Sequence, residues 1–394
     1  MTVLSHRSYW RVLARAGVLT MTLTLALAFS AIADSEEKFY QETDLVSDIP
    51  GRAAVTDMHL KNPWGMSSSS TSPFWVSDNG TGVATLYTGA GQPVPLVVTI
   101  PPPPGSAGPS TPTGQVFNGT ADFVVSKGGS SGPSLFIFAT EDGTISGWNP
   151  CVPPPGPSCA PPSPPLSTTA VLAVDNSGSG AVYKGLAIGS TASGNFLYAA
   201  NFHAGTIDVF DKDFHTPNPP LAGSFSDPDI PTGFAPFNIQ KLEDKLYVTY
   251  AKQNAAKHDD VAGKGNGFVD VFDTNGKFLQ RVASRGHLNS PWGLAVAPED
   301  FGRFSGDLLV GNFGDGLIHA YSREGDHFHF HGQLHGPDGQ PIAIDGLWAL
   351  RFGSDNTPNT RNGPTNVLFF TAGLNDEADG LFGSLVACER NQCQ

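Results

Sequence analysis

Short apolar segments separated by turn residues recur along this chain at a regular spacing. Each copy has an apolar segment, a turn that contains glycine, and a second apolar segment that usually ends in an aromatic residue. Residues 197–210 and 308–321 show the pattern best and align without a gap at a spacing of 111. Segments this short, with turns this frequent, predict antiparallel pairs of β-strands.

The pattern occurs six times, and one further apolar segment precedes each copy. The fifth residue of each copy marks the repeat, with steps of 61, 62, 49, 62 and 60 residues. The marker residues are Asp78, Ala139, Asn201, Tyr250, Asn312 and Ala372. A repeat of this length built from short strands predicts an all-β fold, a six-bladed β-propeller.

Residues 39–46 form an additional candidate strand with no partner nearby in the sequence. We expect this N-terminal strand to pair near residues 381–386, in the last blade, and to close the ring. Closure would leave no exposed sheet edge there. Segments near 101–112 and 150–166 are rich in proline, and we expect them to be loop insertions within the single domain.

The first 33 residues have the pattern of a secretory signal peptide. Three arginines within the first 15 residues precede an apolar segment, and alanines at positions 31 and 33 predict cleavage after Ala33. We therefore expect a secreted or periplasmic protein whose mature part, residues 34–394, is one propeller domain. No other segment is apolar over enough residues to cross a bilayer, so no membrane span is expected in the mature form.

Charge excludes one class of partner. The full chain has 22 basic and 36 acidic residues. Removal of the leader leaves 19 basic and 36 acidic residues, a formal charge of −17. A surface this acidic repels nucleic acid, so no nucleic-acid partner is expected.

The four cysteines fall into two close pairs. Four cysteines allow three pairings, and their order favours the disulfides Cys151–Cys159 and Cys388–Cys393. Disulfides persist in oxidising compartments, which agrees with export.

Polar residues at the marker positions suggest a cation site on the rim of the channel. Oxygen ligands of this kind suit Ca²⁺. The candidate ligands are Asp78, Asn201 and Asn312, which are equivalent in the repeat, and Asp345, which precedes the last inner strand. The same residue types also form tight turns, and that structural explanation stays open. Asn79, Glu141, His203 and Asp315 lie one to three residues beyond their marker positions.

A second candidate metal site is rich in histidine. His327, His329 and His331 alternate, so on a strand they would share one face. Three imidazoles on one face could hold zinc or copper, whereas an exposed outer strand would need no metal. The His-Asp-Asp sequence at residues 258–260 is a weaker candidate of the same kind, and the favoured interpretation is a solvated loop.

Several phrases together resemble a known family: residues 62–65, 74–79, 201–203, 309–316 and 345–348. They resemble a family of exported bacterial proteins of uncharacterised function with an NHL-like β-propeller. Some members carry a C-terminal sorting segment of the PEP-CTERM type. The resemblance covers nearly all of the mature chain and implies no catalytic residues. Wider kin among six-bladed propellers include calcium-dependent lactonases, lyases and binding modules.

Two functions remain open. The favoured hypothesis is a binding or scaffold propeller for an extracellular protein, a polysaccharide or a small molecule, because the chain has no zinc-protease motif and no phosphate loop. The alternative is a calcium-assisted lactonase, esterase or lyase that uses the central channel. In that enzyme the ion would polarise a carbonyl, and His203 or Asp315 would transfer a proton.

Overall fold

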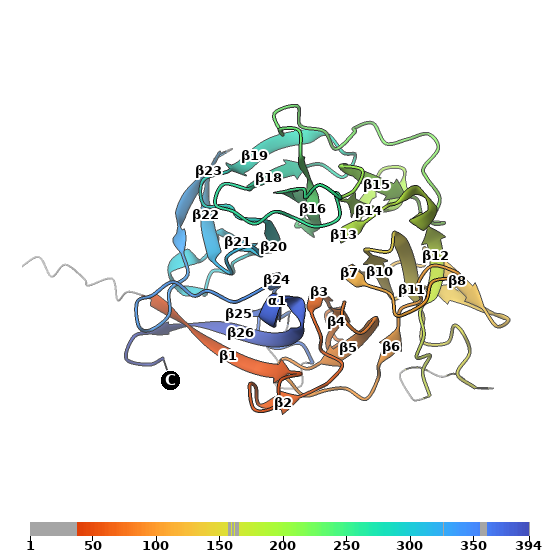
Figure 1. The fold of residues 1–394 in the computed structure, drawn as a ribbon, viewed down its shortest axis with the longest axis horizontal. Coiled ribbons are helices and arrows are strands. Elements are labelled where there is room, and N and C mark those ends of the chain that lie inside the picture. Colours follow the sequence, from red (N-terminus) through yellow and green to blue (C-terminus); the bar gives the residue numbers. More distant parts are fainter. Residues whose placement is uncertain are drawn as a thin grey trace, which may run out of the picture. The chain divides into compact units, whose positions relative to one another are not determined.

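The structure is a computed structural model that describes residues 38–156, 159, 161, 165–325, 327–354 and 361–393. The expected signal peptide, residues 1–33, lies outside the described residues. Six sheets of three to five strands form the blades of a β-propeller (Figure 1). The predicted fold class is therefore confirmed.

The innermost strand of each blade lines the centre of the ring. These strands are β3 (Pro63–Ser67), β7 (Pro112–Phe117), β13 (Tyr183–Thr191), β16 (Phe234–Leu242), β20 (Pro291–Val296) and β24 (Leu347–Phe352). Each contacts the inner strand of the next blade, and β24 contacts β3. The six inner strands thus surround a central channel.

The remaining strands follow outward by antiparallel pairing. The second strands are β4 (Phe74–Asp78), β10 (Phe136–Thr140), β14 (Gly194–Asn201), β17 (Lys245–Lys252), β21 (Leu308–Asn312) and β25 (Val367–Gly373). The third strands are β5 (Val83–Tyr87), β11 (Thr144–Trp148), β15 (Thr206–Phe210), β18 (Gly267–Phe272), β22 (Ile318–Glu324) and β26 (Asp379–Glu389). Outer strands are β6 (Val98–Thr99), β12 (Val171–Asp175), β19 (Phe278–Ser284) and β23 (His327–Gln333). A separate hairpin consists of β8 (Val124–Lys127) and β9 (Ser130–Pro133).

The repeat identified in the sequence reappears as strand register. Asp78, Asn201 and Asn312 each pair with the first residue of their own inner strand. In the second blade a register shift places Thr140, not Ala139, opposite the first residue of β7. In the fourth blade Tyr250 pairs with Pro236, the third residue of β16. Equivalent positions in the sequence are therefore equivalent positions in the blades, apart from these two departures.

The N-terminal strand β1 (Lys38–Ser47) pairs with β26 in the blade that contains β24 and β25 (Figure 1). Its partners run from Glu389 to Leu381, so the expected pairing with residues 381–386 is confirmed. The short strand β2 (Val55–Thr56) adds to the outer side of β1. That β1 is what closes the ring stays a prediction.

Glycines let the inner strands approach one another closely. A Cβ on Gly65 would lie 2.3 Å from the carbonyl oxygen of Thr113, and a Cβ on Gly293 would lie 2.5 Å from that of Trp348. No side chain fits at these distances, because inner strands of neighbouring blades converge around the channel. The sequence Pro-Trp-Gly, which occurs at residues 63–65 and 291–293, therefore serves the packing of the inner strands.

Both expected disulfides are present: Cys151–Cys159, with Cα atoms 5.6 Å apart, and Cys388–Cys393, with Cα atoms 5.4 Å apart. The first lies in the segment between β11 and β12, and the second ties the residues after β26 back to that strand. In the part of the chain that the structure describes, no helix has the length and apolar character needed to cross a membrane.

Candidate functional site

The turns between second and third strands lie beside the first residues of the inner strands in every blade, as the strand register requires. They therefore gather at one end of the channel, which we call the turn-side mouth. Polar side chains from five of the six blades meet there. This convergence makes the turn-side mouth the candidate functional site.

Lys184, the second residue of β13, is the centre of this site. It is 2% exposed. Its ammonium pairs with the carboxylate of Glu141 and lies 3.6 Å from Asp259 Oδ1. The same ammonium lies 4.9 Å from the ring centroid of Trp64. A buried lysine needs such partners, because an unpaired charge is costly to remove from water.

A chain of hydrogen bonds continues from Glu141 to the first and last blades. Asn79 Nδ2 donates to Glu141 Oε2 at 2.8 Å. Asn62 Nδ2 donates to Asn79 Oδ1 at 3.4 Å and to Glu377 Oε1 at 3.0 Å. Together with Lys184 and Asp259, this chain links residues of blades six, one, two, three and four.

Glu377 lies in a turn with an unusual backbone. The short helix α1 (Leu374–Glu377) contains non-glycine residues with φ of 55°, 54° and 64° at Asn375, Asp376 and Glu377. Left-handed residues of this kind cost roughly 1–3 kcal/mol each and cluster at functional sites. The conformation brings the carboxyl group of Glu377 to Asn62.

Burial sets the protonation of several acids at the mouth. Desolvation raises the pKa of Glu377 to about 7, and the charges of Glu141 and Asp260 act in the same direction. Burial also raises the pKa of Asp260, although the nearby Ser290 hydroxyl acts in the opposite direction. Its Oδ2 has no partner with the distance and angles of a hydrogen bond among the described residues. For Asp259, burial is outweighed by the His258 hydrogen bond and the Lys184 ammonium, so its pKa is lowered. The mouth therefore combines a proton donor at neutral pH with an ionised carboxylate.

An aromatic layer lies beneath these polar groups. Trp64 stacks on Trp348 with ring centroids 3.6 Å apart, and Trp292 meets both rings edge-on. Trp348 Nε1 donates to Asn62 Oδ1 at 3.2 Å, and Trp292 Nε1 donates to the carbonyl oxygen of Lys184 at 3.2 Å. The layer keeps water from one side of the site, which strengthens the ionic interactions above it.

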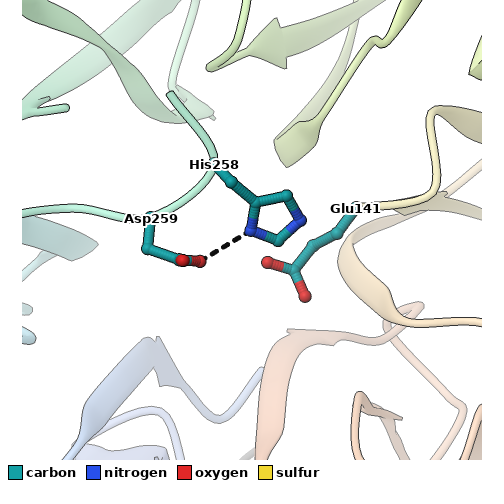
Figure 2. Close-up of side chains that lie close together, drawn as sticks. All are labelled: Glu141, His258 and Asp259. Atoms are coloured by element: carbon teal, nitrogen blue, oxygen red, sulfur yellow. Dashed lines mark hydrogen bonds and ion pairs between the residues drawn. The ribbon is translucent and has the colours of Figure 1, made fainter. Parts of the chain in front are cut away.

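One group of residues could hold a metal. Glu141, His258 and Asp259 project toward one another from two separate loops (Figure 2), and their ligand atoms all lie within 4.8 Å of one another. His258 Nδ1 lies 2.7 Å from Asp259 Oδ1. Lys184 opposes metal binding here, since its ammonium already pairs with Glu141 and repels a second cation.

Comparison with known proteins identifies relatives without an established activity. No family model matches the chain. Uncharacterized protein R648 of Acanthamoeba polyphaga mimivirus is 33% identical over 344 residues, which is 86% of this chain and 78% of R648. Uncharacterized protein L690 of the same virus is 34% identical over 346 residues, which is 87% of this chain and 84% of L690. The chain belongs to the family of these two proteins.

Solved structures add only distant similarities to this family. The alignment with a streptogramin B lyase structure covers 89% of this chain and 98% of the lyase chain, with 12% identity and a TM-score of 0.44. The alignment with the soluble aldose sugar dehydrogenase from Escherichia coli covers 88% of this chain and 99% of the dehydrogenase chain, with 11% identity and a TM-score of 0.47. Similarities this low carry no argument about activity. The relatives found are viral, and the likeness to exported bacterial proteins stays a prediction.

The residues predicted to bind calcium have partners within their own blades. Asp78 is fully buried, and its Oδ2 accepts a hydrogen bond from Thr85 Oγ1 at 2.8 Å. Asn201 Nδ2 donates to Asp208 at 2.9 Å, and Asn312 Nδ2 donates to Asp315 at 3.1 Å. These bonds stabilise the hairpins, and calcium binding by the set stays a prediction.

Two other candidates share a cavity. Asp315 and Asp345 are exposed, and both line a cavity of about 280 Å³ beside the turn of blade five. Asp345 accepts a hydrogen bond from the backbone N–H of Asn375 at 3.0 Å. His203 is half-buried in the turn of blade three. The proton-carrier roles of His203 and Asp315 stay predictions.

The three alternating histidines lie on β23, an outer strand, and all three are exposed. His331 Nδ1 lies 2.6 Å from Asp307 Oδ2, and His329 Nε2 lies 3.9 Å from Glu324 Oε2. Among the described residues, no group of three possible metal ligands with atoms within 4.8 Å of one another includes these histidines. Metal binding at this strand stays a prediction.

Lys184 and Glu377 are the residues that sequence reasoning missed. A signal for Lys184 was available: it occupies the repeat position of Trp64 and Trp292, directly after the first residue of the inner strand. A lysine at a position that is a buried tryptophan in two other blades needs a negatively charged partner. Nothing comparable marks Glu377, because its contact with Asn62 joins residues 315 positions apart.

Proposed function

We propose that the protein is a binding propeller that holds a hydroxyl-rich ligand, a saccharide unit, at the turn-side mouth. One observation carries this proposal. Glu141 and Asp259 contact the ammonium of Lys184, and Asp260 and Glu377 are near enough for its charge to lower the pKa of their carboxyl groups against the effect of burial. Four carboxyl groups thus gather near one ammonium. Carboxylate oxygens accept several hydrogen bonds each, so the site has more acceptors than its own donors satisfy. Hydroxyl groups of a ligand would supply the missing donors.

The unpaired oxygen of Asp260 supports this chemistry most directly. A buried acceptor without a partner costs about 1–3 kcal/mol, and a hydroxyl donated by a ligand removes that cost. Both cysteine pairs are oxidised, which supports a location outside the reducing cytoplasm. An extracellular polysaccharide fits both observations.

The test is a titration of residues 34–394 with neutral mono- and oligosaccharides, followed by tryptophan emission. The aromatic layer under Lys184 includes Trp64, so occupancy of the mouth should change the signal. Asp260→Asn and Glu377→Gln should each weaken binding up to about tenfold, as expected for loss of one hydrogen bond with the ligand. Glu299→Gln is the matched control, because Glu299 is exposed and follows the opposite end of β20. Equal affinity in all four proteins, or no saturable binding of any saccharide, would reject the proposal.

A second function rests on the Glu141–His258–Asp259 group. A metal held there would support a hydrolase or lyase in which Glu377, with its pKa near 7, transfers a proton. Elemental analysis of protein purified without chelator separates the two functions. About one metal ion per chain, lost in His258→Ala and retained in His203→Ala, would favour metal-assisted catalysis over saccharide binding. If calcium is bound and is lost in Asp345→Asn instead, the result would favour the calcium ligands predicted from the sequence, which include Asp345.

A further inference from the structure

The central channel encloses a cavity of about 230 Å³. Residues of all six inner strands line it, from Gly65 and Gly114 near the turn-side mouth to the last-but-one residues of β16 and β24, Lys241 and Arg351, at the opposite end. We call this opposite end the far mouth. The volume is below the roughly 300–1,000 Å³ of sites for drug-sized molecules, so the channel suits a small ligand.

The charge of this cavity is opposite to that of the chain. Among the described residues that line it, Lys241 and Arg351 carry charge, and none is Asp or Glu. The chain as a whole has 36 acidic and 22 basic residues. A wall without carboxylates is therefore unexpected from composition, and it leaves the local potential positive.

Arg351 has only neutral partners. Its Nε lies 3.3 Å from Ser68 Oγ, and its Nη2 donates to the carbonyl oxygen of Ser68 at 3.2 Å. No carboxylate pairs with it within the described ranges. Arg351 is half-buried, and desolvation lowers the pKa of its guanidinium. Buried arginines are ordinarily paired with anions, so the structure supplies a cation without its counter-charge.

The second cation, Lys241, is exposed near the end of β16. Its ammonium donates to the carbonyl oxygen of Glu243 at 2.6 Å, and no carboxylate of the described residues forms an ion pair with it. Two buried oxygens in the wall, Ser67 Oγ and Gln115 Oε1, have no hydrogen-bond partner in the described part of the chain. Unsatisfied buried groups often mark a place where water or a ligand binds.

We propose that the far mouth binds a small oxyanion, a carboxylate or phosphate group, through Arg351 with Lys241. A guanidinium offers two parallel N–H donors that match two oxygens of such a group. The lysine adds charge from the rim. The site is independent of the saccharide site, because the two lie at opposite ends of the inner strands.

The experiment titrates the full chain with inorganic phosphate, lactate or chloride at constant ionic strength, by calorimetry and tryptophan emission. Trp292 lines the cavity and should report occupancy. We expect phosphate or lactate to saturate one site and chloride not to. Arg351→Gln should weaken that binding roughly ten- to hundredfold, since charged hydrogen bonds are lost. Saturation by lactate alone would identify a carboxylate ligand, and saturation by phosphate alone a phosphate ligand.

Three further variants keep the result interpretable. Arg351→Lys keeps the charge without the paired donors and should bind with intermediate affinity. Lys241→Gln alters an exposed residue, so it should fold normally and weaken binding a few-fold. Arg323→Gln removes an exposed charge on β22, away from the lining residues, and should bind like wild type. Absence of saturable binding in the wild type, or wild-type affinity in Arg351→Lys and Lys241→Gln, would overturn the proposal.

Discussion

Replacing Lys184 by methionine should destabilise the protein strongly, because it leaves a buried acid without its cation. The side chain of Lys184 is 2% exposed and that of Glu141 is 11% exposed. Breaking such a pair from one side costs about 3–5 kcal/mol. The contact with Asp259 adds at most about 1 kcal/mol, since that side chain is 60% exposed and solvent screens it. Methionine retains most of the volume, so the main loss is electrostatic.

The double variant separates charge from packing. In Lys184→Met/Glu141→Gln neither partner is charged, so most of the penalty should disappear. The two single variants and the double variant form a cycle, and we expect a coupling energy of about 2 kcal/mol or more. Urea unfolding at pH 7.5 gives the free energies, with an unchanged m-value as the check on comparable unfolding.

Lys127→Met is the matched control, because Lys127 is exposed on β8. It should change the free energy of unfolding by less than about 0.5 kcal/mol. A loss below 1 kcal/mol in Lys184→Met, or strictly additive effects in the cycle, would refute the reasoning. It would mean that water reaches the pair and screens it.

Three further predictions concern protonation and ring closure. The pKa of Glu377 is raised from 4.5 to about 7, so the folded state holds this proton more strongly than the unfolded state does. The bound proton stabilises the fold fully below about pH 4.5, and this stabilisation is lost as pH rises through 7. Wild type should therefore lose up to about 3 kcal/mol relative to Glu377→Gln between pH 4.5 and 8. His319 is 1% exposed, and neither ring nitrogen has a hydrogen-bond partner within distance among the described residues. Burial lowers its pKa from 6.5 to about 4, so its neutral form supports folding above pH 6.5 and that support declines as pH falls toward 4. His319→Leu should lack this acid-induced loss, as measured by urea unfolding between pH 4.5 and 7. A chain that starts at residue 48 lacks β1 and exposes the edge of β26, so it should unfold at lower temperature and associate in size-exclusion chromatography.

Each of these has an outcome that contradicts it. Parallel pH profiles for wild type and Glu377→Gln would show that Glu377 has an ordinary pKa in the folded protein. An equal acid-induced loss in His319→Leu would assign that loss to other groups. A monomeric chain of unchanged thermal stability without β1 would show that the contacts among inner strands close the ring alone.

Much of the fold could be predicted because its determinants are local. Strand segments, glycine turns and their period are visible within stretches of about 60 residues, and the pairing of Asp78, Asn201 and Asn312 with their inner strands follows the repeat. The disulfides join cysteines separated by 8 and 5 residues, so proximity in sequence favoured the correct pairing. The partner of β1 was also predictable, since one strand had no local partner and the last blade had a free edge.

The candidate site was only partly predictable, because its chemistry depends on positions that break the repeat. Equivalence in the repeat pointed to Asn201 and Asn312, whose side chains bond inside their own hairpins. Lys184 departs from the aromatic residues at its repeat position, and its partners Glu141 and Asp259 come from neighbouring blades.

The sequence by itself thus determined the strands, the turns, the number of blades and the disulfides, which depend on short-range periodicity and short separations. Tertiary structure decided which charges meet. Ring formation brings Glu377 to Asn62 across 315 residues and leaves Arg351 without a carboxylate partner in the described chain. The physical reason is that desolvation and pairing of a charge depend on every strand around the channel, and no single repeat contains that information.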